Sequence, residues 1–473
     1  MVRNGFKIPS DARGRGCRPL EMLTYCRVCC AFESACALPA GVIRGFATTS
    51  KQLRLGFALA VILWSGGAQA YPLDGYPATG VLRLEAYRLA QQGKVRGPQE
   101  PKGALLGRDQ VDIRLARRPE VTLPAEDPQL NSALVSFLGE DSDRYGVAVL
   151  DLSDPENPRY GETRGGYRAN PGSVGKLMVV LSVFQALADI YPDDVPARLA
   201  VLKNAMVTAD EFILTDHHEV PIWVPGNPAI QYRRLQIGDR ANLWSYLDWM
   251  LSASSNAAAS MVIRELMLLV YFGKGYPVEP EQSKSFFQKT PKKELSDLLS
   301  RALVEPVARN GLNPEELRQG SFFTEKGKQI VPGTSSCATP RELLRYLVRL
   351  EQGRIVDEAS SREIKRLLYM TQRRIRYASS PALVDAAVYF KSGSLFRCDP
   401  EPGYTCRQYE GNLDNMMNSV AIVEAPAGTL QLHYLVAMMS NVLRKNSAVE
   451  HQSFATRLHR LIESFHRGVS PKP

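Results

Sequence analysis

The hydrophobic pattern of this chain changes from strand-like to helical and back again, which limits the folds that it can adopt. Residues 145–152 are apolar and β-branched, and a second short strand begins at Arg159 after a turn, which predicts a hairpin. From Ser173 to about residue 370 apolar residues recur at helical spacing. Strand patterns return at residues 386–390, 419–423 and 430–437. This order predicts an α/β (α+β) fold: an antiparallel sheet flanked by helices, with an inserted all-helical subdomain.

Single helices can be placed in the middle region and at the end of the chain. The spacing of apolar residues predicts helices at residues 243–251, 257–269, 292–307, 341–352, 361–369 and 454–465. We expect one domain over residues 140–473, with sheet parts at about 140–200 and 380–473 and a helical part at about 200–380. A ligand-binding cleft is expected between the two parts.

The first 70 residues carry a pattern typical of export. Basic residues precede the apolar run of residues 55–64, and small residues follow up to Ala70. This order predicts a secretory signal peptide over residues 51–70, cleaved near Ala70, and an exported protein in the periplasm or outside the cell. Residues 1–50 precede this signal and are expected to be a presequence from an over-extended start.

Composition narrows the partners of the remaining chain. The net charge of +9 comes from scattered basic residues without a dense Lys/Arg run, so no nucleic-acid partner is expected. No later segment reaches the roughly 20 apolar residues that a spanning helix needs, so no stable membrane span is expected. Residues 71–139 are expected to form an N-terminal segment that wraps around the surface of the catalytic domain. Up to about residue 126 this segment is rich in Pro, Gly and charged residues. We expect a monomer.

The cysteines indicate one structural disulfide and no metal site. Cys398 and Cys406 lie close together around a Pro/Gly turn, and an exported protein meets an oxidising compartment, so we expect them to pair and Cys337 to stay free. The cysteines before residue 37 lack a second ligand pair at zinc spacing. The run Asp216-His217-His218-Glu219 offers metal ligands, but neighbours on a strand would point to opposite faces, which makes a poor chelate.

Three polar motifs follow one another along the chain. Ser173-Val174-Gly175-Lys176 places a hydroxyl and an amine three residues apart at a helix start, so both project from one face, and a lysine of lowered pKa can activate the serine. Ser254-Ser255-Asn256 falls on a turn between two predicted helices. Lys391-Ser392-Gly393-Ser394 directly follows a buried strand, where Gly393 lets a ligand approach the backbone.

Taken together, the motifs resemble those of the penicillin-recognising serine enzymes, S-x-x-K, S-x-N and K-[ST]-G. The runs Gln236-Ile237-Gly238-Asp239 and Ala338-Thr339-Pro340-Arg341-Glu342-Leu343-Leu344 are similar to class A β-lactamases. The resemblance covers residues 145–466 and implies a small-molecule β-lactam or cell-wall peptide substrate and no cofactor or metal.

The resemblance also implies roles for single residues. Ser173 is implied as the acylated nucleophile, Lys176 as its proton acceptor, and Ser254 as the proton relay to the leaving nitrogen. The implied substrate-binding residues are Asn256, Lys391, Ser392, Gly393 and Ser394. The backbone N–H groups of Ser173 and Ser394 would form the oxyanion hole.

One departure leaves the activity open. Class A β-lactamases deacylate with a Glu in an E-x-x-x-N pattern before the Thr-Pro helix start, and residues 311–340 contain no such pattern. Glu325 stands nearest to the expected distance, but its neighbours differ. The first interpretation is a β-lactamase-type serine hydrolase. The alternatives are a D-Ala-D-Ala carboxypeptidase or other peptidoglycan peptidase, and a non-hydrolytic penicillin-binding sensor or pseudoenzyme.

Overall fold

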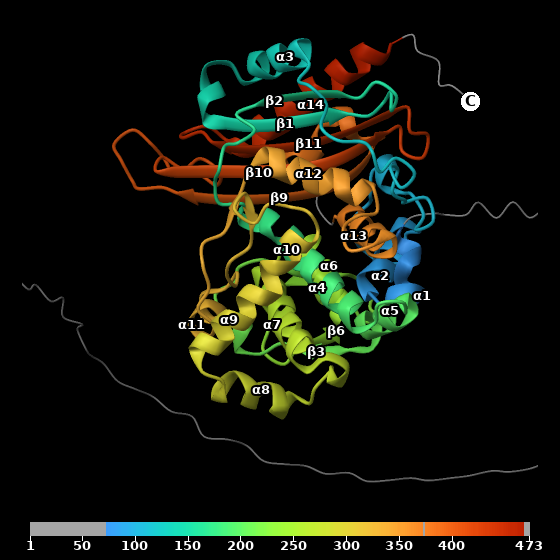
Figure 1. Cartoon of the computed structure of the whole chain (residues 1–473), viewed down its shortest axis with the longest axis vertical. Coiled ribbons are helices and arrows are strands. Elements are labelled where there is room, and N and C mark those ends of the chain that lie inside the picture. Colours follow the sequence, from blue (N-terminus) through green and yellow to red (C-terminus); the bar gives the residue numbers. More distant parts are fainter. Residues whose placement is uncertain (1–71, 372–373, 468–473) are drawn as a thin grey trace, which may run out of the picture. The chain divides into compact units, whose positions relative to one another are not determined.

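A computed structural model describes residues 72–371 and 374–467. The predicted presequence and signal peptide lie outside these residues, so both stay predictions. The domain boundaries at residues 71 and 140 stay predictions as well. Within the described part, a sheet and a helical subdomain follow the order expected from the hydrophobic pattern (Figure 1).

The main sheet has five strands in the order β2-β1-β11-β10-β9, and all neighbours are antiparallel. The strands are β1 (Tyr145–Asp151), β2 (Arg159–Thr163), β9 (Ala387–Arg397), β10 (Asp414–Ala425) and β11 (Leu432–Asn441). The hairpin of β1 and β2 and the three late strands confirm the predicted sheet. Pairing of β1 with β11 joins the two ends of the domain across the helical insertion.

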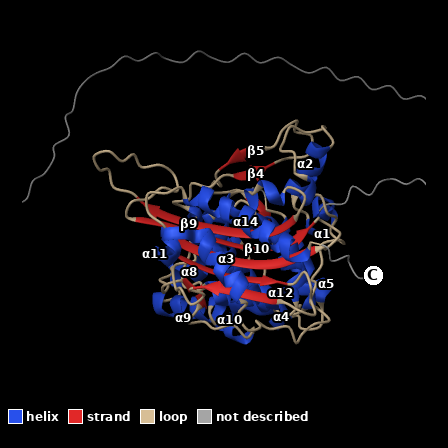
Figure 2. Cartoon of the chain, turned by 90° about the horizontal axis from the view of Figure 1, so that it is seen from above, coloured by secondary structure: helices blue, strands red, loops and turns tan. Residues whose placement is uncertain are grey.

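Helices cover both faces of this sheet (Figures 1 and 2). On one face lie α3 (Pro128–Leu138) and α14 (Ser447–His466), and on the other α12 (Pro340–Glu351) and α13 (Glu358–Tyr369). Phe454, Leu458 and Ile462 of α14 are spaced by four residues and are fully buried in one core cluster with alternate residues of β1. The intervening β1 residues Ala148 and Leu150 belong to the larger core cluster on the other face.

The helical subdomain is built around α4 and α7. Its helices are α4 (Lys176–Ile190), α5 (Val195–Asn204), α6 (Leu243–Leu251), α7 (Asn256–Phe272), α8 (Pro280–Lys289), α9 (Lys292–Leu303), α10 (Glu305–Arg309) and α11 (Glu325–Ile330). Three short strand pairs complete it: β3 (Met206–Thr208) with β6 (Arg240–Asn242), β4 (Val220–Ile222) with β5 (Gln231–Arg233), and β7 (Leu317–Arg318) with β8 (Cys337–Ala338). The prediction of α6 is confirmed at both ends.

Two of the described helices, Gly172–Ile190 and Asn256–Gly275, are apolar and long enough to pass a test for a membrane span. The expectation that no later segment is long and apolar enough for a membrane span is therefore wrong by this test. Of their apolar windows, 78% and 72% are buried inside the fold, as in the core helices of a globular protein.

The N-terminal segment is more deeply packed than a surface wrap. It forms α1 (Tyr76–Thr79) and α2 (Leu82–Gln91), and Leu84 and Tyr87 of α2 are fully buried in the larger core. Arg83 also points inward and forms a buried ion pair with Asp248 of α6. The expectation of a surface path is therefore wrong for α2, because its helical apolar stripe was hidden among charged residues.

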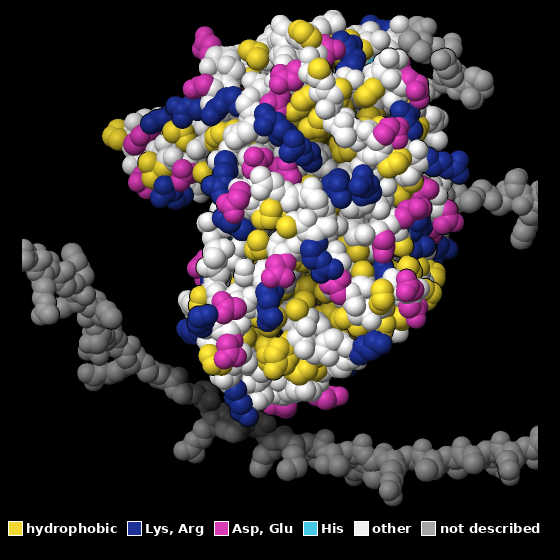
Figure 3. Space-filling model, in the orientation of Figure 1, with side chains coloured by type: hydrophobic (Ala, Val, Ile, Leu, Met, Phe, Trp, Pro, Cys, Tyr) yellow, Lys and Arg dark blue, Asp and Glu magenta, His cyan; other side chains and the backbone are white. Residues whose placement is uncertain are grey.

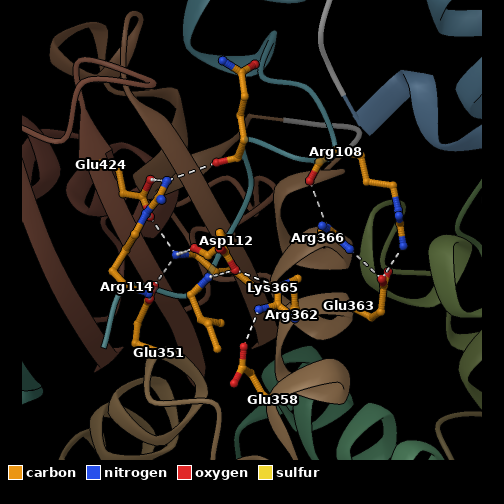
Figure 4. Close-up of polar contacts among 12 residues, drawn as sticks. Arg108, Asp112, Arg114, Glu351, Glu358, Arg362, Glu363, Lys365, Arg366 and Glu424 are labelled. Atoms are coloured by element: carbon orange, nitrogen blue, oxygen red, sulfur yellow. Dashed lines mark hydrogen bonds and ion pairs between the residues drawn. The ribbon is translucent and has the colours of Figure 1, made fainter. Parts of the chain in front are cut away.

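Ion pairs join residues 108–114 to α13 and β10 (Figure 4). Arg114 binds Glu424 of β10, and Lys365 of α13 lies 2.7 Å from the same carboxylate and 2.6 Å from Glu351. Lys365 and its two partners are at most 1% exposed. Because an unpaired buried charge is costly, this network links the segment, the helices and the sheet.

The surface and the cysteines add two observations. Acidic and basic side chains are interspersed on the face seen in Figure 3. A disulfide joins Cys398 and Cys406 in the connection between β9 and β10, and Cys337 is a buried free thiol.

Candidate active site

Ser173 lies on the 3-10 helix Gly172–Gly175, one turn before α4 begins at Lys176. The expected α-helix start is therefore displaced by a tighter turn, entered through Gly172 at φ +53°. The Oγ atom of Ser173 accepts a hydrogen bond of 2.9 Å from the Nζ atom of Lys176. The spacing of three residues thus brings the hydroxyl and the amine into contact.

Lys176 is fully buried and makes two further hydrogen bonds. Its Nζ atom donates to the backbone oxygen of Ser254 at 2.7 Å and to Oδ1 of Asn256 at 2.8 Å. Burial lowers the pKa of Lys176 to about 7, against a smaller raising effect of Asp216. A large fraction of this lysine is therefore neutral near pH 7 and can accept the proton of Ser173.

The second motif forms a tight turn before α7. Ser254 has φ +59°, in the left-handed region, and Ser255 caps α7 by accepting from the N–H of Ala258. The turn directs the Ser254 backbone oxygen to Lys176, while its Oγ atom accepts from Nζ of Lys391 at 2.9 Å. Ser254 therefore links the two lysines, and its strained backbone is what points its two oxygens to different partners.

The third motif does not end its strand. Lys391, Ser392, Gly393 and Ser394 lie inside β9, which stays paired with β10 as far as Arg397. The expectation that the strand ends before Lys391 is therefore wrong, because pairing with β10 carries the chain onward in extended form. Burial, with Lys176 and Arg376 nearby, holds the pKa of Lys391 well below its usual range.

Gly393 lets β9 pass close to the Ser173 turn. A Cβ atom at this position would lie 2.5 Å from the backbone nitrogen of Ser173 and 2.7 Å from the oxygen of Pro171. The nitrogen of Ser394 would lie 3.6 Å from a Cβ atom built on Gly172. The two backbone N–H groups expected in an oxyanion hole thus come from segments in close contact.

Arg376 is a residue that sequence reasoning missed. It lies at the start of the 3-10 helix Arg376–Ser379 at φ +57°, and its guanidinium donates to Oγ of Ser392 at 2.8 Å and of Ser394 at 2.9 Å. It also donates to the hydroxyl of Tyr409 at 3.2 Å. No local pattern marks this arginine, because it reaches the motif through tertiary packing of a loop.

The charges of the site favour an anionic ligand. Lys176, Lys391 and Arg376 are three basic side chains of the site, and among the described residues none of them forms an ion pair with a carboxylate. The two serine hydroxyls on β9 stand beside Arg376. Such an arrangement binds a carboxylate through charge-assisted hydrogen bonds.

Residues 311–340, where class A β-lactamases carry the deacylating Glu, instead place the phenyl ring of Phe323 next to Lys176. Nζ of Lys176 lies 4.7 Å from the ring centroid of Phe323. Glu325 instead has a 64% exposed side chain that pairs with Lys328. Within the part of the chain that the structure describes, no acidic side chain hydrogen-bonds Ser173 or Lys176.

Asp216 contacts the motif of Ser254 to Asn256, a role that sequence reasoning missed. Asp216 lies on a loop before β4 and not on a strand. The expectation that neighbouring side chains would point to opposite faces of a strand is therefore wrong. The donor atoms of Asp216, His217 and His218 lie within 4.8 Å of one another. Both carboxylate oxygens of Asp216 are, however, engaged by the protein: Oδ1 by His218, and Oδ2 by Ser255 and Ala257. Through these contacts Asp216 holds the turn of Ser254 to Asn256 in place.

Comparisons with known proteins identify a family for this chain. Residues 129–458 match the family described as "Beta-lactamase enzyme family". No curated protein matches.

Solved structures with a similar fold include PBP-A, at 15% identity over 72% of this chain and 100% of that one with a TM-score of 0.46. A β-lactamase from Sphaerobacter thermophilus gives 15% identity, 72% and 99% coverage and a TM-score of 0.46. The TLA-3 extended-spectrum β-lactamase gives 14% identity, 71% and 98% coverage and a TM-score of 0.45. The family match covers well over half of the chain, and the chain therefore belongs to the β-lactamase enzyme family.

Proposed function

We propose that this protein is a serine hydrolase that becomes acylated on Ser173 by a β-lactam or by a related D-Ala-type amide. The observation that carries the proposal is the 2.9 Å hydrogen bond between Ser173 and a fully buried Lys176 whose pKa is lowered to about 7. A buried lysine with no carboxylate partner has a proton-accepting amine, which a surface lysine lacks at neutral pH.

The contacts support a complete first half-reaction. Lys176 takes the proton of Ser173 as the Oγ atom bonds to the substrate carbonyl carbon, and the N–H groups of Ser173 and Ser394 receive the oxyanion. The amide C–N bond then breaks. The leaving nitrogen takes a proton from Oγ of Ser254, and Nζ of Lys391, which donates to that oxygen at 2.9 Å, supplies the replacement proton.

The anionic part of the substrate is assigned to the middle of β9, at Ser392 and Ser394. Ser392, Ser394 and Arg376 present two hydroxyls and a guanidinium, with Lys391 behind them. A carboxylate is the group that such a set would prefer. β-Lactams and peptides that end in D-Ala both carry one.

Phe323 favours a second candidate function, that of a penicillin-binding peptidase or sensor with slow release. A phenyl ring over Lys176 offers no proton acceptor for a water at this point. The acyl-enzyme would then form and persist. Fast antibiotic hydrolysis would need a base elsewhere in the site.

Export to the periplasm or the medium is part of the proposal. The charged and apolar pattern of residues 51–70 supports it, and the disulfide between Cys398 and Cys406 is of the kind that persists in an oxidising compartment.

Intact-mass spectrometry of the purified protein with benzylpenicillin, sampled over time, tests these proposals. We expect an adduct of one penicillin that Ser173→Ala abolishes. A transient adduct with loss of antibiotic would mean β-lactamase turnover, and a lasting adduct would mean a peptidase or sensor. Absence of any adduct would contradict the proposed function.

A further inference from the structure

The loop between the 3-10 helix Glu211–Ile213 and β4 places a carboxylate at the motif of Ser254 to Asn256. Oδ2 of Asp216 accepts from Oγ of Ser255 at 2.9 Å and from the backbone N–H of Ala257 at 2.8 Å. These are the residues on either side of Asn256, which binds Lys176. Asp216 therefore holds the turn from which Ser254 and Asn256 both reach the lysine.

A histidine completes the arrangement. Oδ1 of Asp216 accepts from the backbone N–H of His218 at 3.1 Å and lies 2.6 Å from its Nδ1 atom. The Asp216 side chain is only 3% exposed, while that of His218 is 28% exposed. The carboxylate is thus shielded from solvent between the imidazole and the N-terminus of α7, where the helix dipole also stabilises a negative charge.

We propose that Asp216 is a positioning residue of the active site, which holds Ser254 and Asn256 against Lys176 and supplies a negative charge that acts on this lysine. The inference rests on the proposed function, since it concerns the proton acceptor of acylation. Asp216, a residue outside the three motifs, would then control both the position of the groups that bind Lys176 and the charge state of this lysine.

The electrostatics support this assignment. Lys176 has no ion-pair partner among the described residues, and Asp216 is the acidic group that opposes the lowering of its pKa by burial. The other charged or titratable groups near Lys176 and Asp216 are Lys391 on β9 and His217 and His218 on the loop. Burial lowers the pKa of His218, and the nearby Lys176 lowers it further. Near neutral pH the imidazole is therefore uncharged, and the carboxylate acts on Lys176 as an anion.

The negative charge of Asp216 determines the direction in which its removal shifts the pH midpoint of acylation. Acylation requires neutral Lys176, so its rate should rise with pH, with a midpoint near the lysine pKa of about 7. Removal of the negative charge of Asp216 makes protonated Lys176 less stable. The midpoint should therefore move to lower pH.

Asp216→Asn tests the inference, because asparagine keeps the shape and can still accept from Ala257 while the charge is lost. The second-order rate of acylation by benzylpenicillin is measured from pH 5 to 9 by intact mass, for the wild-type protein and the variant. We expect the midpoint to fall by about one pH unit, so that at pH 6 the fraction of the plateau rate rises about fivefold.

Asp239→Asn is the matched control. Asp239 also lies in a loop of the helical subdomain and accepts a backbone hydrogen bond from Gln236 at 2.7 Å, but its partner is Arg233 and not the active site. The control should lose some thermal stability without a change in the midpoint. If Asp216→Asn fails to fold, Asp216→Ser, which is also uncharged, should show the same shift.

Each outcome decides the inference. An unchanged midpoint in an Asp216 variant that is still acylated would show that the residue only caps α7, and it would overturn the inference while the proposed function stands. A wild-type protein that forms no adduct would overturn both. A shifted midpoint in the Asp216 variants, with Asp239→Asn unchanged, would establish the positioning role.

Discussion

The phenyl ring of Phe323 lies over the amine of Lys176, with Nζ 4.7 Å from the ring centroid. Lys176 in turn binds Ser173, so the ring closes one side of the group that activates the nucleophile. An apolar wall there helps to keep the lysine dry and neutral. The same wall leaves a water near the acyl-enzyme without a proton acceptor from this segment.

Phe323→Glu should therefore turn slow release into turnover. A carboxylate at this position can accept the proton of an attacking water, and we expect the rate of adduct loss to rise at least about tenfold, in line with general-base catalysis. The measurement is the lifetime of the penicillin adduct by intact mass. Phe323→Leu, which stays apolar, should keep the adduct, and an equally long lifetime in Phe323→Glu would contradict the explanation.

Arg376→Gln should weaken the binding of carboxylate-bearing substrates. The guanidinium bonds to Ser392 and Ser394, and loss of a charge-assisted contact corresponds to about a tenfold or greater rise in the concentration for half-maximal acylation. Arg397→Gln, where the arginine is 71% exposed, is the control. The methyl ester of the β-lactam should bind both proteins about equally, and a persistent difference with the ester would place Arg376 outside the carboxylate site.

His451 should make the fold sensitive to acid. It is fully buried between Ser419 and Ser440, and burial lowers its pKa to about 3, with Arg376 adding to the effect. Because the pKa is lower in the folded state than in the unfolded chain, the unfolded state binds the proton first, and stability is lost as pH falls below about 6.5.

Between pH 7.5 and 5 the loss of unfolding free energy from this group should reach about 2 kcal/mol. Urea titrations of the wild-type protein and of His451→Gln check this, and the variant should lose less stability over that range. His217→Gln, in which an exposed histidine is replaced, is the control. Equal losses in all three proteins would contradict the prediction.

Lys365→Met should destabilise the fold by about 3–5 kcal/mol, because it leaves the buried carboxylate of Glu351 without its lysine partner and leaves Glu424 with Arg114 alone. Glu351 and Glu424 lie 2.6 Å and 2.7 Å from Nζ of Lys365, and all three side chains are inaccessible to solvent or nearly so. Urea denaturation gives the change. Lys293→Met, at a lysine 85% exposed, should alter stability little, and a similarly small effect at Lys365 would show that the network contributes no net stability.

The sequence by itself determined the features that depend on neighbours along the chain. Apolar spacing located α6, α7, α12, α13, α14 and the strands of the main sheet, since burial of one face leaves a period of 3.6 or 2 in the sequence. The spacing of Ser173 and Lys176 is equally local, because three residues bring two side chains to one face of a turn. The order of the three motifs then indicated the family, and the family match confirmed it.

Only the tertiary structure decided which distant segments complete the site. Phe323 and Asp216 lie in loops, Arg376 begins a short 3-10 helix, and none of the three carries a periodic pattern. Lys176 meets Ser254 across 78 residues, and Lys391 meets it across 137. Hydrophobic spacing records which face of an element is buried but not which loop is packed against it. The protein surface around Ser173 is therefore set by packing between segments far apart in the chain.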